Sequence, residues 1–471
     1  MITIEKSNAS TVLPLPIAHE QILSKLLVQL KKIEFRQLAG LEGQDKLQRK
    51  HFIVYAIEEI LKSAKEQGWQ LCRNNGQTYL YNGEYWKIID RELLQDFFGR
   101  AAEMLGVPQA DARFYTFRLD LLKQFEAVSY LPPPERVNGK TLVNCKNGTF
   151  EVEGYEQKLR EHRAEDFLTH QLPFEYNSAA NSPLFHIFLD KVLPGREEQM
   201  ILQEYLGYVF VDAKKLKLEK VLLLYGGGAN GKSVFIEVLS ALLGPDNVSR
   251  FSLESITDPK GYSRAELSNK LLNLSTEISG RLDKGIFKQL ASGESVEARF
   301  IYGSPFTMEN YARLLFSTNE LPKETENSNG FFRRWQIVPF DVTIPEHEQD
   351  KELSKKIIDA ELSGVFNWVL DGLNRLLKNK RFTESKAVKQ QVESFRLQSD
   401  SVLMFLDDEG YQKSPNDTIE FKRLFELYRV YCNESGYYAC SKRTFSERLR
   451  NAGFHTHKMN YGNIVYAKKS S

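Results

Sequence analysis

Eight residues from Gly226 to Ser233 have the types and the order of a phosphate-binding loop. An apolar run that predicts a buried strand, Val221–Tyr225, precedes them, and an amphipathic helix is predicted from Val234. Glycines let backbone N–H groups turn inward around phosphates, and a helix start adds partial positive charge. Lys232 would reach the β- and γ-phosphates of a nucleotide and Ser233 would ligate Mg²⁺. The alternative is a glycine-rich turn without a ligand, but the strand before and the helix after favour a nucleotide site. Its predicted members are Gly226, Gly227, Gly228, Ala229, Asn230, Gly231, Lys232 and Ser233.

A phosphate loop needs an acid that holds Mg²⁺ and positions water, at the end of a second buried strand. The segment Lys270–Glu277 reads K-L-L-N-L-S-T-E and ends in such an acid. Glu277 is therefore the predicted metal ligand and catalytic base. The alternative is a surface glutamate at the end of a strand.

Two later segments supply the remaining candidate catalytic groups. The apolar run Arg313–Asn319 ends in an amide that can orient the attacking water or sense the γ-phosphate, although strand ends also use asparagine in turns. Arg333 and Arg334 follow, just before another apolar strand. Paired arginines at such a place are often surface ion-pair partners, and in a ring ATPase they instead enter the neighbouring subunit's site as an arginine finger.

Composition limits the classes of protein that these residues can serve. The chain has 471 residues, 42% hydrophobic and 27% charged, which excludes disorder over its whole length. The net charge of +1 excludes a uniformly basic surface, but not a basic channel or a small basic domain. No apolar run approaches the roughly 18 residues that span a bilayer, and the N-terminus lacks a signal peptide's pattern, so we expect an intracellular protein. The cysteines have neither zinc-site nor disulfide spacing, which fits a reducing cytosol; they are Cys72, Cys145, Cys432 and Cys440.

The periodicity of the chain predicts the elements that position the candidate residues. Residues 15–65 are predicted helical, Trp69–Ile89 a β-meander and residues 91–130 helical again. A proline run, Pro132–Pro134, precedes a second β-rich patch at residues 141–154. Helices are predicted over 183–212 and 350–398, on either side of an alternating α/β pattern at 220–345 that is typical of a parallel sheet.

Together the motifs resemble those of superfamily 3 helicases, most closely the phage, plasmid and poxvirus primase-helicase family. The resemblance rests on G-G-G-A-N-G-K-S, K-L-L-N-L-S-T-E, F-K-Q-L-A-S-G-E-S-V-E-A-R-F-I-Y-G-S-P-F, L-L-F-S-T-N and F-F-R-R-W-Q-I-V-P-F in that order. It extends upstream through Y-L-Y-N-G-E-Y-W-K-I-I and L-V-N-C-K-N-G-T-F-E-V, and covers residues 70–345 well and the C-terminal tail loosely. The five motifs are specific as a set.

The resemblance implies a role for each matched position. Lys232 and Ser233 take the Walker A roles, Asn319 the sensor position, and Arg334 fits the finger better than Arg333. Glu277 takes the second acidic place of Walker B, but Thr276 stands where many members have another acid, so Glu277 contacts Mg²⁺, activates water, or does both.

The family's extra motif, Lys288–Phe306, would form a hairpin that projects into the ring channel. Arg299 and Phe306 would flank its tip near Tyr302, and Lys288 would add positive charge near DNA. A cation and an aromatic ring suit a strand of phosphates and stackable bases. The alternative for Tyr302 is an ordinary core residue of the hairpin.

Five regions follow from the pattern and the resemblance: a helical segment 1–65, an α+β domain 66–182, the ATPase core 183–345, a helical extension 346–400 and a C-terminal domain 401–471. The predicted fold is an α/β, AAA+-like P-loop ATPase between the mixed N-terminal region and a winged-helix-like C-terminal domain. The family often carries a primase in front. Because residues 1–65 are fewer than a polymerising domain of about 100–150 residues needs, we expect any primase to be a separate protein.

The C-terminal tail is basic, with 11 Lys or Arg against 5 Asp or Glu from Lys413 to Ser471. Helices at Phe421–Glu434 and Ser441–Ala452 and a strand pair around residues 460–463 predict a helix-turn-helix followed by a wing. Ser441 is a good N-cap, and Phe445 and Leu449 would face the core. The basic residues left outside would be Lys442, Arg443, Arg448 and Arg450, which favours DNA binding, with a protein-docking module as the alternative.

The leading hypothesis is an ATP- and Mg²⁺-dependent DNA helicase that forms a ring, expected to be a hexamer, and replicates a phage, plasmid or other mobile element. Its partners would be single-stranded and forked DNA, further copies of the chain, and a separate primase or polymerase in a bacterial cytoplasm. A second hypothesis is an origin-binding initiator with little unwinding activity. A third is an ATPase switch in a defence or packaging system.

Overall fold

The computed structural model divides the chain into two compact units. One unit comprises Met1–Ala180 with Leu242–Gly244, and the other Asn181–Ala241 with Pro245–Ser471. The residues that the structure describes are 3–4, 18–74, 76–131, 139–154, 156–276, 278, 282–321, 329–460 and 462–470.

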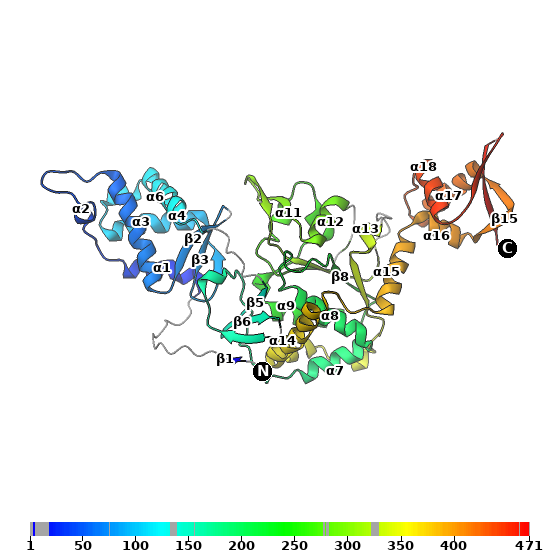
Figure 1. Ribbon diagram of the computed structural model, residues 1–471, viewed down its shortest axis with the longest axis horizontal. Helices are drawn as coiled ribbons and strands as arrows, with labels where there is room; N and C mark the ends of the chain where they lie inside the picture. The colour runs from blue at the N-terminus through cyan, green and yellow to red at the C-terminus, as the bar shows by residue number, and fades with distance from the viewer. Residues whose placement is uncertain are drawn as a thin grey trace. The chain divides into compact units, whose positions relative to one another are not determined.

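The first unit begins with helices that share one hydrophobic core (Figure 1). They are α1 (His19–Gln29), α2 (Phe35–Leu38), α3 (Arg49–Glu66), α4 (Arg91–Leu105), α5 (Gln109–Arg113) and α6 (Tyr115–Val128). The predicted apolar stripe of α1 is confirmed, because Ile22 and Leu26 are fully buried and pack in the same core as Phe98 and Phe125. The helices of residues 19–66 thus share a core with elements beyond the predicted boundary at residue 65.

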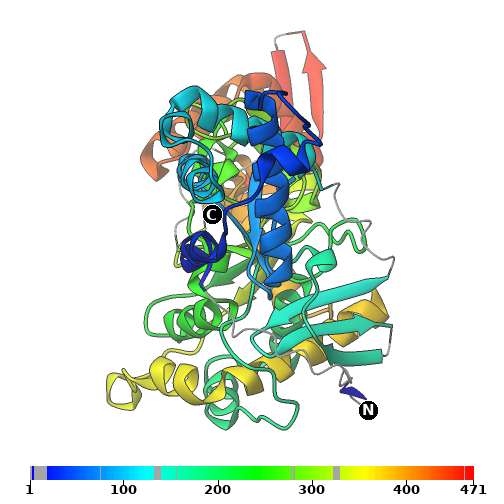
Figure 2. The same cartoon turned by 90° about the vertical axis from the view of Figure 1, so that its left-hand side faces the viewer.

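Two sheets complete this unit. The predicted meander is confirmed as an antiparallel sheet of β2 (Gln70–Asn74), β3 (Gln77–Tyr81) and β4 (Trp86–Ile88). The second β-rich patch forms β5 (Lys140–Cys145), β6 (Gly148–Glu153) and β7 (Glu156–Arg160), side by side in Figure 2, with the short β1 (Thr3–Ile4) parallel to β7. A 3₁₀ turn, η1 (Ala164–Asp166), follows β7.

Four helices surround the central sheet of the second unit: α7 (Pro183–Val192), α8 (Arg196–Tyr208), α14 (Leu353–Asn379) and α15 (Lys386–Gln398). Buried acids join them. Both carboxylate oxygens of Glu361, on α14, accept hydrogen bonds at 2.9 Å from the Leu184 and Phe185 amides at the start of α7. Glu204, on α8, pairs with Arg375 of α14 at 2.6 Å.

A five-stranded, fully parallel sheet forms the centre of this unit, which confirms the predicted α/β pattern. Its order is β14 (Trp335–Pro339), β8 (Val221–Tyr225), β13 (Arg313–Thr318), β10 (Leu272–Ser275) and β9 (Val248–Ser249). Strands β8, β10, β13 and β14 are almost entirely buried, because helices cover a parallel sheet on both faces. The accompanying helices are α9 (Lys232–Leu243), η2 (Pro245–Asn247), α10 (Leu253–Thr257), α11 (Tyr262–Ala265), α12 (Lys284–Ser292), α13 (Asn329–Phe332) and η3 (Glu346–Glu348).

The C-terminal residues form a core of their own. Helices α17 (Phe421–Ser435) and α18 (Lys442–Asn451) and the hairpin of β16 (Thr456–Met459) and β17 (Gly462–Lys469) confirm the predicted order of elements. Two elements were not predicted, α16 (Ser401–Asp408) and β15 (Tyr411–Glu420), which pairs with β17. Phe445 and Leu449 are fully buried, as expected.

The four cysteines are free thiols, as their spacing predicted. In the described ranges no helix combines the length and the apolar character that crossing a bilayer requires.

Candidate functional site

The loop from Gly226 to Gly231 connects β8 to α9 at the carboxyl edge of the central sheet. Its first glycine cannot carry a side chain, because a Cβ there would lie 2.3 Å from the Phe340 carbonyl oxygen. Gly231 has φ +84°, and a Cβ would lie 2.6 Å from Val192 Cγ1. Between them, Gly227, Gly228 and Ala229 are exposed. The loop is therefore packed at its two ends and open in its middle, as a phosphate cradle requires.

Lys232 points its ammonium group back into this loop. Its Nζ donates to the carbonyl oxygens of Gly226 at 2.6 Å and Gly227 at 2.9 Å. It also donates to Asn230 Oδ1 at 3.1 Å. Burial lowers the pKa of Lys232 from its ordinary value. Four oxygens, the fourth from Asn319, thus hold the cation at the open middle of the loop.

Asn319 reaches this cluster from the neighbouring strand. Strand β13 lies beside β8, with Thr318 opposite Tyr225, so the residue that follows β13 lies next to the loop that follows β8. Asn319 Oδ1 accepts a hydrogen bond from Lys232 Nζ at 3.1 Å. The structure therefore brings together the predicted phosphate-binding lysine and the predicted sensor.

The predicted acid, Glu277, lies outside the described residues. Strand β10, which precedes it, ends at Ser275 beside Phe316 of β13, so its carboxyl end is at the same edge of the sheet as the loop. Ser233 is exposed at the start of α9. Across the described ranges, no three His, Cys, Asp or Glu side chains gather as a metal site.

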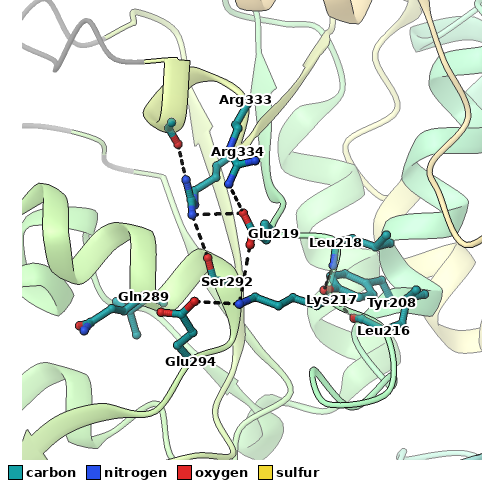
Figure 3. A network of polar contacts seen from close by, with 12 residues as sticks. Tyr208, Leu216, Lys217, Leu218, Glu219, Gln289, Ser292, Glu294, Arg333 and Arg334 are labelled. Carbon is teal, nitrogen blue, oxygen red and sulfur yellow. Dashed lines mark hydrogen bonds and ion pairs between the residues drawn. The ribbon is translucent and has the colours of Figure 1, made fainter.

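Arg333 and Arg334 lie in very different surroundings, although they are adjacent (Figure 3). The Arg334 side chain is 9% exposed, and its Nη2 contacts Glu219 Oε2 at 3.1 Å and Ser292 Oγ at 3.0 Å. The Arg333 side chain is 62% exposed, and its Nη2 contacts Glu219 Oε2 at 2.6 Å. Both arginines are therefore ion-paired within their own chain, which was the alternative that the sequence left open.

The extra motif forms an antiparallel hairpin of β11 (Val296–Arg299) and β12 (Pro305–Met308). Tyr302, at its tip, is fully exposed with φ +61°, so the alternative of a core residue is wrong. Phe306 is only partly exposed, because its ring stacks on the ring of Phe300 with 5.2 Å between the centroids. Arg299 is exposed, and its Nε donates to the Gly303 carbonyl at 2.9 Å, which braces the turn. Lys288 is half-buried on α12, before the hairpin.

Helix α18 leaves three of the four predicted basic residues exposed: Lys442, Arg443 and Arg450. Ser441 caps the helix, since its Oγ accepts from the Thr444 amide at 3.2 Å. Lys442 and Arg443 are exposed in its first turn. Arg448 was wrongly predicted to face solvent or phosphate: it is half-buried and pairs with Asp400 at 3.2 Å.

Sequence reasoning missed two residues that hold this region together. Glu219 contacts both arginines from just before β8. Arg264 is buried, and its guanidinium donates to the carbonyls of Glu297 at 2.7 Å and Ile256 at 3.0 Å, which anchors β11. Both contacts depend on which strands are neighbours, so no local pattern points to them.

The fold and its loop indicate the class of protein. A five-stranded parallel sheet with a glycine-rich loop between β8 and α9 fits a P-loop-like domain. Three protein families match separate parts of the chain. "D5 N terminal like" matches residues 58–194, "Family of unknown function (DUF5906)" residues 224–334 and "Poxvirus D5 protein-like" residues 397–469.

Two viral proteins are similar over longer stretches. The "Putative helicase L207/L206" of Acanthamoeba polyphaga mimivirus is 23% identical over 255 residues, 51% of this chain and 26% of that protein. The "Putative helicase 184R" of Invertebrate iridescent virus 6 is 22% identical over 344 residues, 63% of this chain and 35% of that protein. The chain thus covers only about a quarter to a third of these relatives. These matches support the resemblance to D5-like superfamily 3 helicases that the motifs indicated.

Solved structures of the NrS-1 C-terminal region are also similar. One aligns with a TM-score of 0.47 at 12% identity, covering 87% of this chain and 99% of that one. Another aligns with a TM-score of 0.48 at 13% identity, covering 89% of this chain and all of that one.

Proposed function

We propose that this chain is the ATP-driven motor of a DNA helicase that works as a ring of identical subunits in the replication of a phage, plasmid or other mobile element. One observation carries the proposal: the ammonium of Lys232 meets the amide of Asn319, at 3.1 Å, where two neighbouring parallel strands end. Ligands of parallel α/β sheets bind at the carboxyl ends of the strands. The similarity to helicase-named viral proteins and the exposed hairpin support DNA as the substrate.

The residues at the carboxyl edge of the sheet fit a nucleoside triphosphate with Mg²⁺. The exposed backbone of residues 227–229 and the start of α9 would hold the phosphates, and Lys232 would exchange its loop carbonyls for phosphate oxygens. Ser233 would ligate the metal. Asn319, which already accepts a hydrogen bond from Lys232, would orient the attacking water or keep the Lys232 ammonium in place. Glu277 would hold Mg²⁺ and act as the catalytic base, as the sequence predicts. ATP, when bound, supplies the phosphoanhydride bond whose hydrolysis drives the motor.

A ring would place an arginine of one subunit at the phosphates of the next. The sequence favours Arg334 for this role, from its position before β14. Because Arg334 is buried against Ser292 and Glu219, whereas 62% of the Arg333 side chain is exposed, we propose Arg333 instead as the arginine finger.

The hairpin of β11 and β12 would contact the DNA strand. Tyr302 is fully exposed and Ile301 largely exposed at its tip, and Arg299 lies beside the turn. A base can stack on a tyrosine ring with a gain of about 1–3 kcal/mol. The hairpin lies between β10 and β13 in the chain, and Asn319 follows β13, so the position of the hairpin would follow the state of the nucleotide.

The test compares the wild-type chain with Lys232→Ala in three assays: ATP hydrolysis, assembly by electron microscopy and unwinding of a forked DNA. We expect the wild type to form rings with ATP and to unwind the fork. Lys232→Ala should lose hydrolysis by at least about 10²–10³-fold, because it removes the charge that meets the transferred phosphate, while the chain still folds, as circular dichroism would show. Steady hydrolysis by Lys232→Ala would refute the site.

A second candidate function is an origin-binding initiator that unwinds little. It is favoured by the C-terminal residues, which have their own core and present Lys442 and Arg443 on a capped helix. We propose that this domain is winged-helix-like and contacts duplex DNA. Footprinting on the element's own origin, together with absence of fork unwinding, would select the initiator.

A further inference from the structure

We infer that Glu219 is a positioning residue for the arginine pair: it anchors Arg334 inside its own subunit and aims Arg333 outward. This inference rests on the proposed function and names the residue on which the shared site depends. A single carboxylate oxygen, Oε2, meets Arg333 at 2.6 Å and Arg334 at 3.1 Å. One side chain therefore controls both candidate fingers (Figure 3).

The segment that carries Glu219 is itself held rigidly. The buried Tyr208 hydroxyl donates to the Leu216 carbonyl and accepts from the Leu218 amide, both at 3.2 Å. Lys217 pairs with Glu294 at 2.7 Å, on the connector between α12 and β11. Glu219 has φ +55°, a backbone conformation that costs a residue with a side chain about 1–3 kcal/mol and persists only where surrounding contacts impose it. The carboxylate thus has a defined direction before any ligand binds.

The two arginines are fixed to different degrees. Arg334 is closed in by Glu219, by Ser292 at 3.0 Å and by the Gly330 carbonyl, so it cannot reach another subunit without leaving a buried ion pair. The Arg333 backbone is held from the other side, because Lys220 Nζ donates to its carbonyl at 2.6 Å. Its guanidinium keeps the Glu219 contact but is otherwise open to solvent. Without Glu219, the cations Lys217, Arg333 and Arg334 would have Glu294 as their one remaining carboxylate among the residues that the structure describes. The Arg333 side chain would then no longer be held in one orientation.

The experiment uses Glu219→Gln, which keeps the shape and removes the charge. Its matched control is Glu309→Gln, which breaks an exposed ion pair with Lys214 at 2.9 Å. Each is compared with Arg333→Ala, alone and mixed with Lys232→Ala subunits over a range of ratios. Lys232→Ala cannot use its own site but offers normal Glu219 and Arg333 to a neighbour. We expect Glu219→Gln to lower kcat by about 10–100-fold, since a displacement of about 1 Å at a reacting group costs about that much.

Mixing with Lys232→Ala should restore activity to Glu219→Gln with the same dependence on the ratio as for Arg333→Ala. Two measurements besides activity accompany the mixing. The affinity for a non-hydrolysable ATP analogue, measured below the protein concentration at which subunits assemble, should stay within twofold of the wild type. Assembly driven by the analogue and followed by sedimentation should need more protein for Glu219→Gln and for Arg333→Ala than for the wild type. Glu219→Asp should recover part of the rate, and Glu309→Gln should match the wild type.

The outcomes separate the two proposals. If mixing with Lys232→Ala restored activity to Arg333→Ala but not to Glu219→Gln or Glu219→Asp, this inference alone would be overturned. Loss of affinity for the ATP analogue in both Glu219 variants would have the same consequence. A wild type that neither hydrolyses ATP nor assembles with the analogue would remove the proposed function, and this inference with it.

Discussion

Arg333 and Arg334 show how far adjacent side chains of one type can differ in role. Burial makes Arg334 part of the packing between α12, α13 and β14, whereas Arg333 contacts Glu219 from the surface. A buried charge that loses its partners costs far more than an exposed one, because only the exposed charge is compensated by water.

The difference predicts unequal effects on stability. Arg334→Ala should lower the free energy of unfolding by about 1–3 kcal/mol, since it removes the hydrogen bond to Ser292 and the buried ion pair with Glu219. Arg333→Ala should cost less than about 1 kcal/mol. Urea unfolding of both variants, followed by intrinsic fluorescence, measures the difference. Equal losses would show that Arg334 is not anchored as described.

The hairpin of β11 and β12 carries two exposed hydrophobic side chains at its tip. Its base is fixed by Arg264 and its turn by Arg299, while Ile301 and Tyr302 contact little of their own chain. The exposed ring of Tyr302 on this braced turn is placed to stack on a base, in line with the DNA contact proposed for the hairpin.

Tyr302→Ala should therefore reduce the number of base pairs unwound per ATP hydrolysed by at least about tenfold, because stacking worth about 1–3 kcal/mol per base is lost. The measurement divides the rate of fork unwinding by the rate of phosphate release under the same conditions. Tyr130→Ala is the control, since Tyr130 is also exposed but lies in the first unit. A ratio equal to that of the wild type would assign the DNA contact to another element.

Helix α18 is ten residues long and polar on most of its surface, so we expect its N-terminal cap to contribute measurably to its stability. Ser441→Ala removes the acceptor of the Thr444 amide and should cost about 1 kcal/mol. Amide hydrogen exchange in the first turn of α18 should become about fivefold faster. Ser446→Ala, in the middle of the same helix, should leave that exchange unchanged, and equal effects would exclude capping as the cause.

The chain as a whole is nearly neutral, so any attraction to DNA must come from local charge. The C-terminal residues supply a local excess of cations, with Lys442 and Arg443 on the exposed first turn of α18. Each phosphate that a cation binds releases a counterion, so affinity falls with salt in proportion to the number of bound phosphates.

Lys442→Ala combined with Arg443→Ala should weaken duplex binding and reduce the slope of log affinity against log salt by about 0.9 for each phosphate that the variant no longer binds. The control, Lys62→Ala with Lys65→Ala on α3, removes the same charge from another exposed helix. Fluorescence anisotropy at several salt concentrations measures both. An equal change of slope in the control would mean that net charge, rather than α18, attracts the DNA.

Local features were predictable from the sequence because neighbouring residues produce them. The strand, loop and helix around Lys232, the meander at Trp69–Ile89 and the cap at Ser441 all follow from spacing and residue type over one or two turns. The order of motifs was specific enough to indicate the family.

Contacts between distant residues required the tertiary structure. Lys232 meets Asn319 across 87 positions, and Arg333 meets Glu219 across 114, because β13 and β14 lie on either side of β8. Strand order is a property of the whole sheet, and the alternation of apolar and polar residues does not encode it. For the same reason the burial of Arg334, the exposure of Tyr302 and the pairing of Arg448 with Asp400 became known only from the fold.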